Sequence, residues 1–82
     1  MRYCQGMTRT QLRRRLEASA RLTGPRVPGG RYLCAYWHRT YTVMAMGTVL
    51  DDGWPWFTVR WDDTGEVATH RTPWDRRDRV VA

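Results

Sequence analysis

Apolar and polar residues alternate with a period of two in much of the C-terminal half of the chain. The clearest case lies in the stretch 54–72, where Phe57, Val59 and Trp61 share one face of a strand and Trp56, Thr58 and Arg60 share the other. Such alternation is typical of a half-buried β-strand. The turn sequence Asp62-Asp63-Thr64-Gly65 follows it, with Asp and Gly at the positions that turns favour. The stretch therefore predicts a β-hairpin with Phe57, Val59 and Trp61 in the core.

Shorter stretches of the same kind predict further strands at 31–39, 41–50 and 79–81. In the first, Leu33, Ala35 and Trp37 should share one face. Gly47 in the second indicates a bulge or a close backbone approach. The segment 72–75 breaks the pattern and can form a single helical turn. Short strands joined by regularly spaced turns predict a mainly β fold, a small five-stranded antiparallel barrel over 31–82.

A helical pattern occurs only between Thr8 and Thr23. Thr8 and Gln11 match a capping box, and Gly24-Pro25 is a strong stop signal. The predicted inward stripe is narrow and consists of Leu12, Leu16, Ser19, Ala20 and Thr23. The chain is thus expected to comprise an irregular start and one N-terminal α-helix at 1–23, a Gly/Pro-rich linker at 24–30 and a β-barrel at 31–82.

The charge of the chain narrows the choice of partner. The 82 residues carry a formal charge of +6, and all fourteen basic residues are Arg. Such a charge favours phosphate or acidic protein surfaces. Lys, Ile and Asn are absent, which indicates a GC-rich genome and a bacterial or phage source. With no apolar run of membrane-spanning length and no signal-peptide pattern, we expect a cytoplasmic protein with no membrane partner.

Arginines crowd the predicted helix, where Glu17 is the only acidic residue. Arginine beside exposed aromatic residues is the composition that proteins use to track a nucleic-acid backbone. The candidate nucleic-acid-binding residues are Arg9, Arg13, Arg14, Arg15, Arg21, Arg26, Arg60, Trp54 and Trp56. We therefore expect a small regulatory module that binds DNA or RNA. The alternative is an adaptor or inhibitor, encoded by a phage or a bacterium, that binds an acidic host protein such as a polymerase or nuclease through its barrel loops.

The order of aromatic residues and turns over 30–81 resembles the Tudor-like branch of small SH3-like barrels. The resemblance is carried by Cys34-Ala35-Tyr36-Trp37, by Tyr41, and by the stretch FTVRW followed by DDTG. It implies an aromatic cage between two loops, with Trp37 and Tyr41 on one side and Trp61 on the other, where Asp62 or Asp63 supplies the polar partner. The family's remaining aromatic position falls near Thr64.

The sequence gives less support to catalysis or metal binding. Both Asp pairs, 51–52 and 62–63, sit where turns already explain them, and no phosphate-binding loop is present, so we do not expect an enzyme. Cys4, Cys34, His38 and His70 could in principle make a four-ligand zinc site. Because Cys34 and His38 would lie ~13 Å apart in a strand, we expect neither a metal nor a cofactor.

Overall fold

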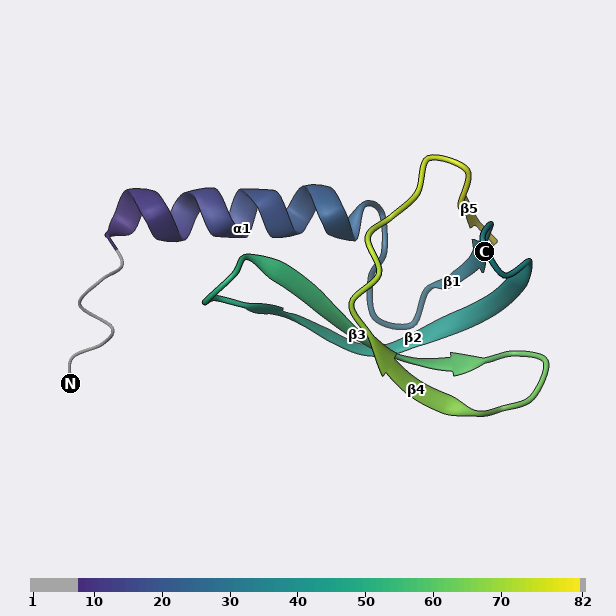
Figure 1. The fold of residues 1–82 in the computed structure, drawn as a ribbon. Helices are drawn as coiled ribbons and strands as arrows, with labels where there is room; N and C mark the ends of the chain where they lie inside the picture. The colour runs from purple at the N-terminus through teal and green to yellow at the C-terminus, as the bar shows by residue number, and fades with distance from the viewer. Residues whose placement is uncertain (1–7, 82) are drawn as a thin grey trace.

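In the computed structural model, which describes residues 8–81, one helix precedes five strands (Figure 1). The elements are α1 (Arg9–Thr23), β1 (Arg31–Cys34), β2 (Arg39–Val49), β3 (Trp54–Trp61), β4 (Val67–His70) and β5 (Arg79–Val80). All strand pairs are antiparallel, and the order across the sheet is β4-β3-β2-β1-β5. The predicted mainly β class with one N-terminal helix is confirmed. Within the described residues β4 and β5 do not pair, so the sheet is open.

The central hairpin has the register that the alternation predicts. Phe57, Val59 and Trp61 are buried, whereas Arg60 is exposed. In the turn, Gly65 has a positive φ of 76° and donates its backbone N–H to the Trp61 carbonyl at 2.7 Å. A left-handed residue at this position suits glycine because it has no Cβ. β3 pairs with β2 on one side and with β4 on the other, so it is an interior strand of the sheet.

The inward face of the sheet carries the core. Its fully buried apolar members are Tyr32, Tyr41, Val43, Phe57, Val59 and Trp61, with Cys34, Met46 and Trp74 packed against them. Cross-strand pairs align them in rows, since Tyr32 lies opposite Tyr41 and Tyr41 lies opposite Trp61. Aromatic side chains make up most of this small core because they bury the largest area per residue.

The first predicted strand is shorter than the prediction. β1 ends at Cys34, and residues 35–38 form a turn in which His38 has a positive φ of 56° and donates its backbone N–H to the Cys34 carbonyl at 2.8 Å. The assignment of Trp37 to a strand face was therefore wrong. Cys34 pairs with Arg39, so residues 35–38 must connect the two strands as a turn, although Tyr36 and Trp37 are residues that strands favour. No helical turn forms at 72–75, where the chain is irregular.

Gly47 marks a close approach and not a bulge. The register shift in β2 lies between Val43 and Ala45, so Met44 is the extra residue. A Cβ at Gly47 would lie 2.6–2.9 Å from three atoms of the Trp56 indole. The absence of a side chain at Gly47 therefore lets the Trp56 ring lie across β2.

Both predicted ends of α1 are confirmed. Thr8 accepts a hydrogen bond from the Gln11 backbone at 3.1 Å, and the Gln11 side chain accepts one from the Thr8 backbone at 2.9 Å. This capping box satisfies two N–H groups that have no partner within the helix. The helix ends at Gly24, whose φ is 63° and whose N–H is donated to the Ala20 carbonyl at 3.1 Å.

The helix presents a different face to the sheet from the one predicted. Ser19 is buried as expected and lies 2.8 Å from Thr48, hydroxyl to hydroxyl. Leu16 is 46% exposed, and Ala20 is also exposed. Arg15 takes the inward place instead, because a Cβ on Gly53 would lie only 3.2 Å from the Arg15 Cβ. The contacts of Ser19 with Thr48 and of Arg15 with Gly53, at the tip of the β2–β3 hairpin, set the rotation of α1 about its axis. The pattern of apolar positions along the helix does not predict this rotation.

The segment 24–30 joins helix and sheet, but it is packed against the sheet along its length. Gly29 donates its N–H to the Val43 carbonyl at 2.8 Å, and Val43 donates to the Gly30 carbonyl at 3.0 Å. The Val27 N–H donates to the Tyr32 hydroxyl at 2.8 Å. These bonds hold the segment against β1 and β2, and they place Arg26 in the interior.

Candidate nucleic-acid interface

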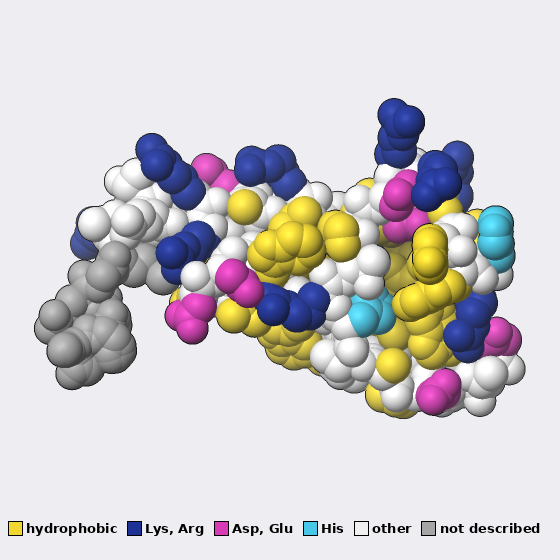
Figure 2. All heavy atoms as spheres, in the orientation of Figure 1, with side chains coloured by type: hydrophobic (Ala, Val, Ile, Leu, Met, Phe, Trp, Pro, Cys, Tyr) yellow, Lys and Arg dark blue, Asp and Glu magenta, His cyan; other side chains and the backbone are white. Residues whose placement is uncertain are grey.

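Four arginines of α1 are exposed and form a basic surface. We call this set the helix arginine face: Arg9, Arg13, Arg14 and Arg21. Arginine side chains project along the helix in Figure 2. Among the described residues, the ion pairs are Arg31–Asp62, Arg39–Asp63, Arg71–Asp52 and Arg77–Asp75, and none of them involves α1. The structure therefore leaves the positive charge of the helix uncompensated.

Two of the predicted phosphate contacts have structural roles instead. Arg15 is half-buried and donates from Nη1 to the Leu50 carbonyl at 2.8 Å, which fastens α1 to the hairpin tip. Arg26 is only 3% exposed, so its assignment to the interface was wrong. Its guanidinium donates to the carbonyls of Leu22, Thr23 and Thr72, each at 2.9 Å.

The burial of Arg26 has a clear physical basis. Carbonyls at the C-terminal end of a helix carry partial negative charge, and here Leu22 and Thr23 supply them. The guanidinium carbon also lies 3.8 Å from the centroid of the Phe57 ring and 5.7 Å from that of Trp74. Aromatic faces attract a cation that has lost water. Arg26 thus joins the helix end, the sheet and the loop at Thr72.

The other predicted residues lie on the sheet. Trp54, Trp56 and Arg60 occupy alternate positions of β3, on the face opposite to Phe57 and Val59. Trp54 is 40% exposed, Trp56 is half-buried and Arg60 is exposed. We call the row Trp54, Trp56, Thr58 and Arg60 the outer strip.

The helix arginine face and the outer strip do not form one site. α1 lies against β3 through the inward side of the hairpin, where Ser19 meets Thr48 and where Thr48 pairs with Pro55. The indoles of Trp54 and Trp56 project from the other side, because neighbouring residues of a strand alternate between faces. The sequence prediction joined two surfaces that the hairpin separates.

The aromatic residues of the cage implied by the Tudor-like resemblance do meet. The ring centroid of Trp61 lies 5.5 Å from that of Trp37 and 5.5 Å from that of Tyr41. His70 joins them at 6.1 Å from Tyr41 and 6.5 Å from Trp61. The cavity between these rings has a volume of about 10 Å³, roughly the space of one water molecule. In this structure Tyr41 and Trp61 belong to the buried core, whereas Trp37 packs at its edge and is 49% exposed.

A charged side chain of the protein itself covers the cluster. The Arg39 guanidinium lies 4.2 Å from the Trp61 ring centroid, held there by two hydrogen bonds to Asp63 at 2.9 Å each. Asp62, which the cage assignment included, instead accepts from Arg31 and Thr42 at 3.1 Å each. Burial alone would raise the pKa of Asp62, but hydrogen bonds from Thr40, Arg31 and Thr42 outweigh it and hold that pKa below its usual value.

A groove that the sequence did not predict runs beside the β1–β2 turn. It has a volume of about 220 Å³, and Tyr36, Pro73, Trp74, Asp75 and Arg77 contribute to its walls. Tyr36 is 76% exposed and the neighbouring Trp37 is 49% exposed. The prediction of a strand at 31–39 concealed this feature, because strand periodicity does not show which aromatic residues project from a turn.

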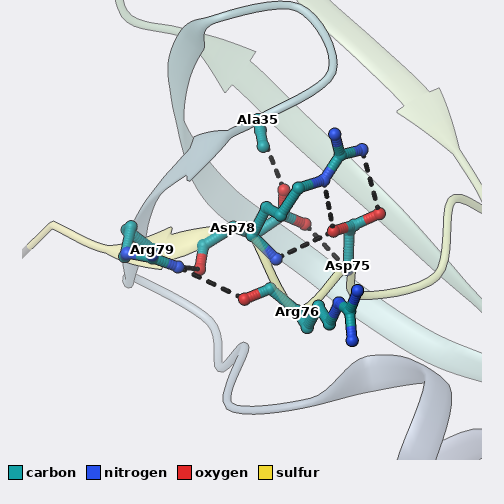
Figure 3. Close-up of polar contacts among 6 residues, drawn as sticks. Ala35, Asp75, Arg76, Asp78 and Arg79 are labelled. Atoms are coloured by element: carbon teal, nitrogen blue, oxygen red, sulfur yellow. Dashed lines mark hydrogen bonds and ion pairs between the residues drawn. The ribbon is translucent and has the colours of Figure 1, made fainter.

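Asp78 organises the wall of this groove. Its Oδ1 accepts the Ala35 backbone N–H at 2.8 Å, and its Oδ2 accepts the Asp75 backbone N–H at 3.0 Å (Figure 3). The side chain of Asp75 in turn accepts from Arg77, and this hydrogen bond lowers the pKa of Asp75. The buried carboxylate of Asp78 therefore fixes the loop 75–78 against the β1–β2 turn.

The described residues contain no group of three His, Cys, Asp or Glu side chains able to hold a metal ion. Cys4, one of the four residues weighed as zinc ligands, lies outside them. Cys34 and His38 flank a turn, so the distance expected for an extended strand does not apply. Nowhere in residues 8–81 does a helix have the length and hydrophobicity needed to span a bilayer.

Comparison with known proteins found no matching protein-family model, no matching curated protein and no matching solved structure. The class of the protein is therefore given by its fold, which is mainly β with one helix followed by an open five-stranded antiparallel sheet.

Proposed function

We propose that the protein is a small non-enzymatic nucleic-acid-binding module that contacts the phosphate backbone through the helix arginine face. The observation that carries this proposal is the uneven distribution of charge. Residues 8–23 contain five Arg against one Glu, a net charge of +4, whereas residues 24–82 contain eight Arg against seven acidic residues, a net charge of +1. Exposed, unpaired arginines are the groups that displace counterions from phosphates.

The strand order supports a second part of the proposal, which concerns the fold family. A meander of four strands, followed by a fifth that pairs back onto β1, is the arrangement expected of a Tudor-like or SH3-like barrel. We place the protein among such barrels. The fold alone does not select a ligand, so the functional proposal depends on the arginines of α1.

The test compares two double variants with the same change of charge. Arg14→Gln with Arg21→Gln removes two exposed groups of the helix, and Arg76→Gln with Arg79→Gln removes two exposed groups from the other end of the chain. Binding of labelled DNA by fluorescence anisotropy at several salt concentrations should show a salt slope flatter by about one unit per lost contact for the helix variant.

The control variant should keep the parent slope. Both variants should fold, since exposed substitutions usually cost under ~0.5 kcal/mol. Equal weakening by the two variants would mean that only net charge matters. A parent that binds neither DNA nor RNA at low salt would contradict the proposal.

The groove beside Tyr36 favours a second candidate function, an adaptor that binds an acidic protein. Two large aromatic side chains on one turn, 76% and 49% exposed, next to a groove of about 220 Å³ are unusual for a surface without a partner. The test is a pull-down after nuclease treatment with the parent and Tyr36→Ala. A protein captured by the parent and lost with the variant supports this function, whereas loss on nuclease treatment alone supports the first proposal.

A further inference from the structure

The outer face of the sheet is a surface that no element of the described chain covers. Inward-facing residues of β2 and β3 meet α1, the segment 24–30 and the loop at 72–74, whereas the alternate residues of the same strands face away from all three. An antiparallel sheet often has one solvated face, and that face is usually polar. Here it carries Trp54 at 40% exposure and Val67 at 56% exposure.

The side chains of the outer strip follow an order along β3. Two indoles at 54 and 56 come first, then the Thr58 hydroxyl, which lies 2.9 Å from that of Thr69, and then Arg60. The strip is about 20 Å long at ~3.3 Å per residue. Within residues 8–81 Arg60 has no carboxylate partner, and its cross-strand neighbours are Thr42 and Val67.

The backbone arrangement presents the Trp56 indole to solvent on one side. Gly47 lies directly opposite Trp56 in the register, and three ring atoms would contact a Cβ placed there. The ring therefore rests over the β2 backbone, which supports one face and leaves the ring half-buried. Gly47 thus supports the Trp56 ring from below and, having no side chain, does not cover its outward side.

We infer that the outer strip binds single-stranded nucleic acid, with bases stacked on Trp54 and Trp56 and a phosphate bound by Arg60. This inference rests on the proposed function in its choice of ligand, but it uses a different surface. The spacing of the indoles selects the single strand. Alternate strand positions lie ~7 Å apart, and consecutive bases of a duplex strand are stacked ~3.4 Å apart with their faces covered.

Stacking on an aromatic platform is available only to bases that have left the helical stack, and every base has a π-face to offer. Arg60 forms no ion pair within residues 8–81, which agrees with a phosphate at the end of the strip, and the hydroxyls between it and the indoles suit the polar sugar-phosphate chain. Binding should therefore show little dependence on sequence.

The experiment measures binding of labelled (dT)12 and of a 12-base-pair duplex by fluorescence anisotropy. Three single variants are compared with the parent: Trp54→Ala, Arg60→Gln and Val27→Ala. Val27 is the control, an exposed apolar side chain on the segment 24–30, outside the strip. Far-UV circular dichroism confirms the fold of each variant, and Arg60→Gln retains a test of the strip if Trp54→Ala fails to fold.

The expected result is a loss of (dT)12 affinity of about 5- to 100-fold in Trp54→Ala, with duplex binding unchanged. Arg60→Gln should flatten the salt slope for (dT)12 by about 0.7 of a unit. Val27→Ala should match the parent with both ligands.

The contrary outcomes distinguish a failure of the inference on the outer strip from a failure of the proposed function. If the parent binds DNA but Trp54→Ala and Arg60→Gln bind (dT)12 as the parent does, the inference is wrong and the proposed function stands. Equal losses on single strand and duplex would also overturn it, because the strip would not select unpaired bases. A parent that binds neither ligand at low salt overturns both.

Discussion

The helix and the sheet of this protein use arginine in opposite ways. On the sheet and its loops, four arginines pair with aspartates, and Arg39 lies over the Trp61 ring as well. On α1, four arginines are exposed and form no ion pair among the described residues, and the inward contact depends on the small Ser19. Arginines near the core are therefore held in ion pairs within the protein, whereas those of α1 are free to contact a partner. The helix is the better candidate for a partner surface.

Arg26 marks the boundary between the two regions. It belongs to neither pattern, because it is buried without an aspartate and is stabilised by carbonyls and aromatic rings. It connects the last turn of α1 to the sheet. How strongly the two regions depend on one another can be measured by substitutions on each side of this contact.

The largest effect is expected from Trp61→Ala, which removes the ring that contacts Trp37, Tyr41 and His70. The free energy of unfolding should fall by about 3–5 kcal/mol, as for other large aromatic truncations in a core. Urea denaturation measures it. Leu16→Ala on the exposed side of α1 is the control and should cost under ~0.5 kcal/mol. Similar losses from both would contradict the division into a structural sheet and a weakly packed helix.

A smaller loss is expected from Arg26→Met, which keeps an apolar stem but removes the donors to Leu22, Thr23 and Thr72. Each hydrogen bond to a charged group contributes about 1.5–3 kcal/mol, and part of the loss is recovered by hydration, so we expect about 2–4 kcal/mol in total. Amide hydrogen exchange should also show faster opening of the last turn of α1.

Arg21→Met is the matched control for that substitution, since Arg21 is an exposed arginine of the same helix. It should leave both the unfolding free energy and the exchange rates nearly unchanged. If Arg26→Met is as stable as Arg21→Met, the buried guanidinium does not join the two regions.

The smallest effect is a pH dependence that should belong to the sheet alone. Burial among the core rings, with a contribution from Arg26, lowers the pKa of His70 below its ordinary value of 6.5. The unfolded chain therefore binds the proton more readily. Stability should be full above pH 6.5 and should fall as the pH drops through the lower folded pKa, by less than about 1.4 kcal/mol per pH unit.

Urea midpoints between about pH 5.5 and 7.5, largely above the range in which carboxylates titrate, isolate this contribution. His70→Gln should make the midpoint constant over this range, while His38→Gln, at an exposed position, should preserve the dependence. DNA binding through α1 does not involve His70, so it should not follow the same curve. A dependence that survives in His70→Gln would assign it to another group.

Much of the fold follows from local patterns. The capping box at Thr8, the stop at Gly24 and the inward set Phe57, Val59 and Trp61 all have the positions that their sequence signals predict. The end of β1 does not, because Tyr36 and Trp37 suit a strand as well as a turn. The rotation of α1 was also missed, since Arg15 can cover a glycine with its stem while Leu16 stays exposed.

The candidate interface could likewise be predicted only where it depends on neighbouring residues in the sequence. The sequence shows that arginines crowd the helix and that indoles alternate with apolar residues in β3, because both are properties of neighbours along the chain. Only the tertiary structure decides that Arg26 is buried, that Arg39 covers Trp61 and that the hairpin separates the arginines from the indoles. The reason is that a guanidinium is satisfied equally well by phosphate, carboxylate, carbonyl or an aromatic face. Which of these it meets depends on residues far away in sequence, such as Thr72 for Arg26 and Asp63 for Arg39.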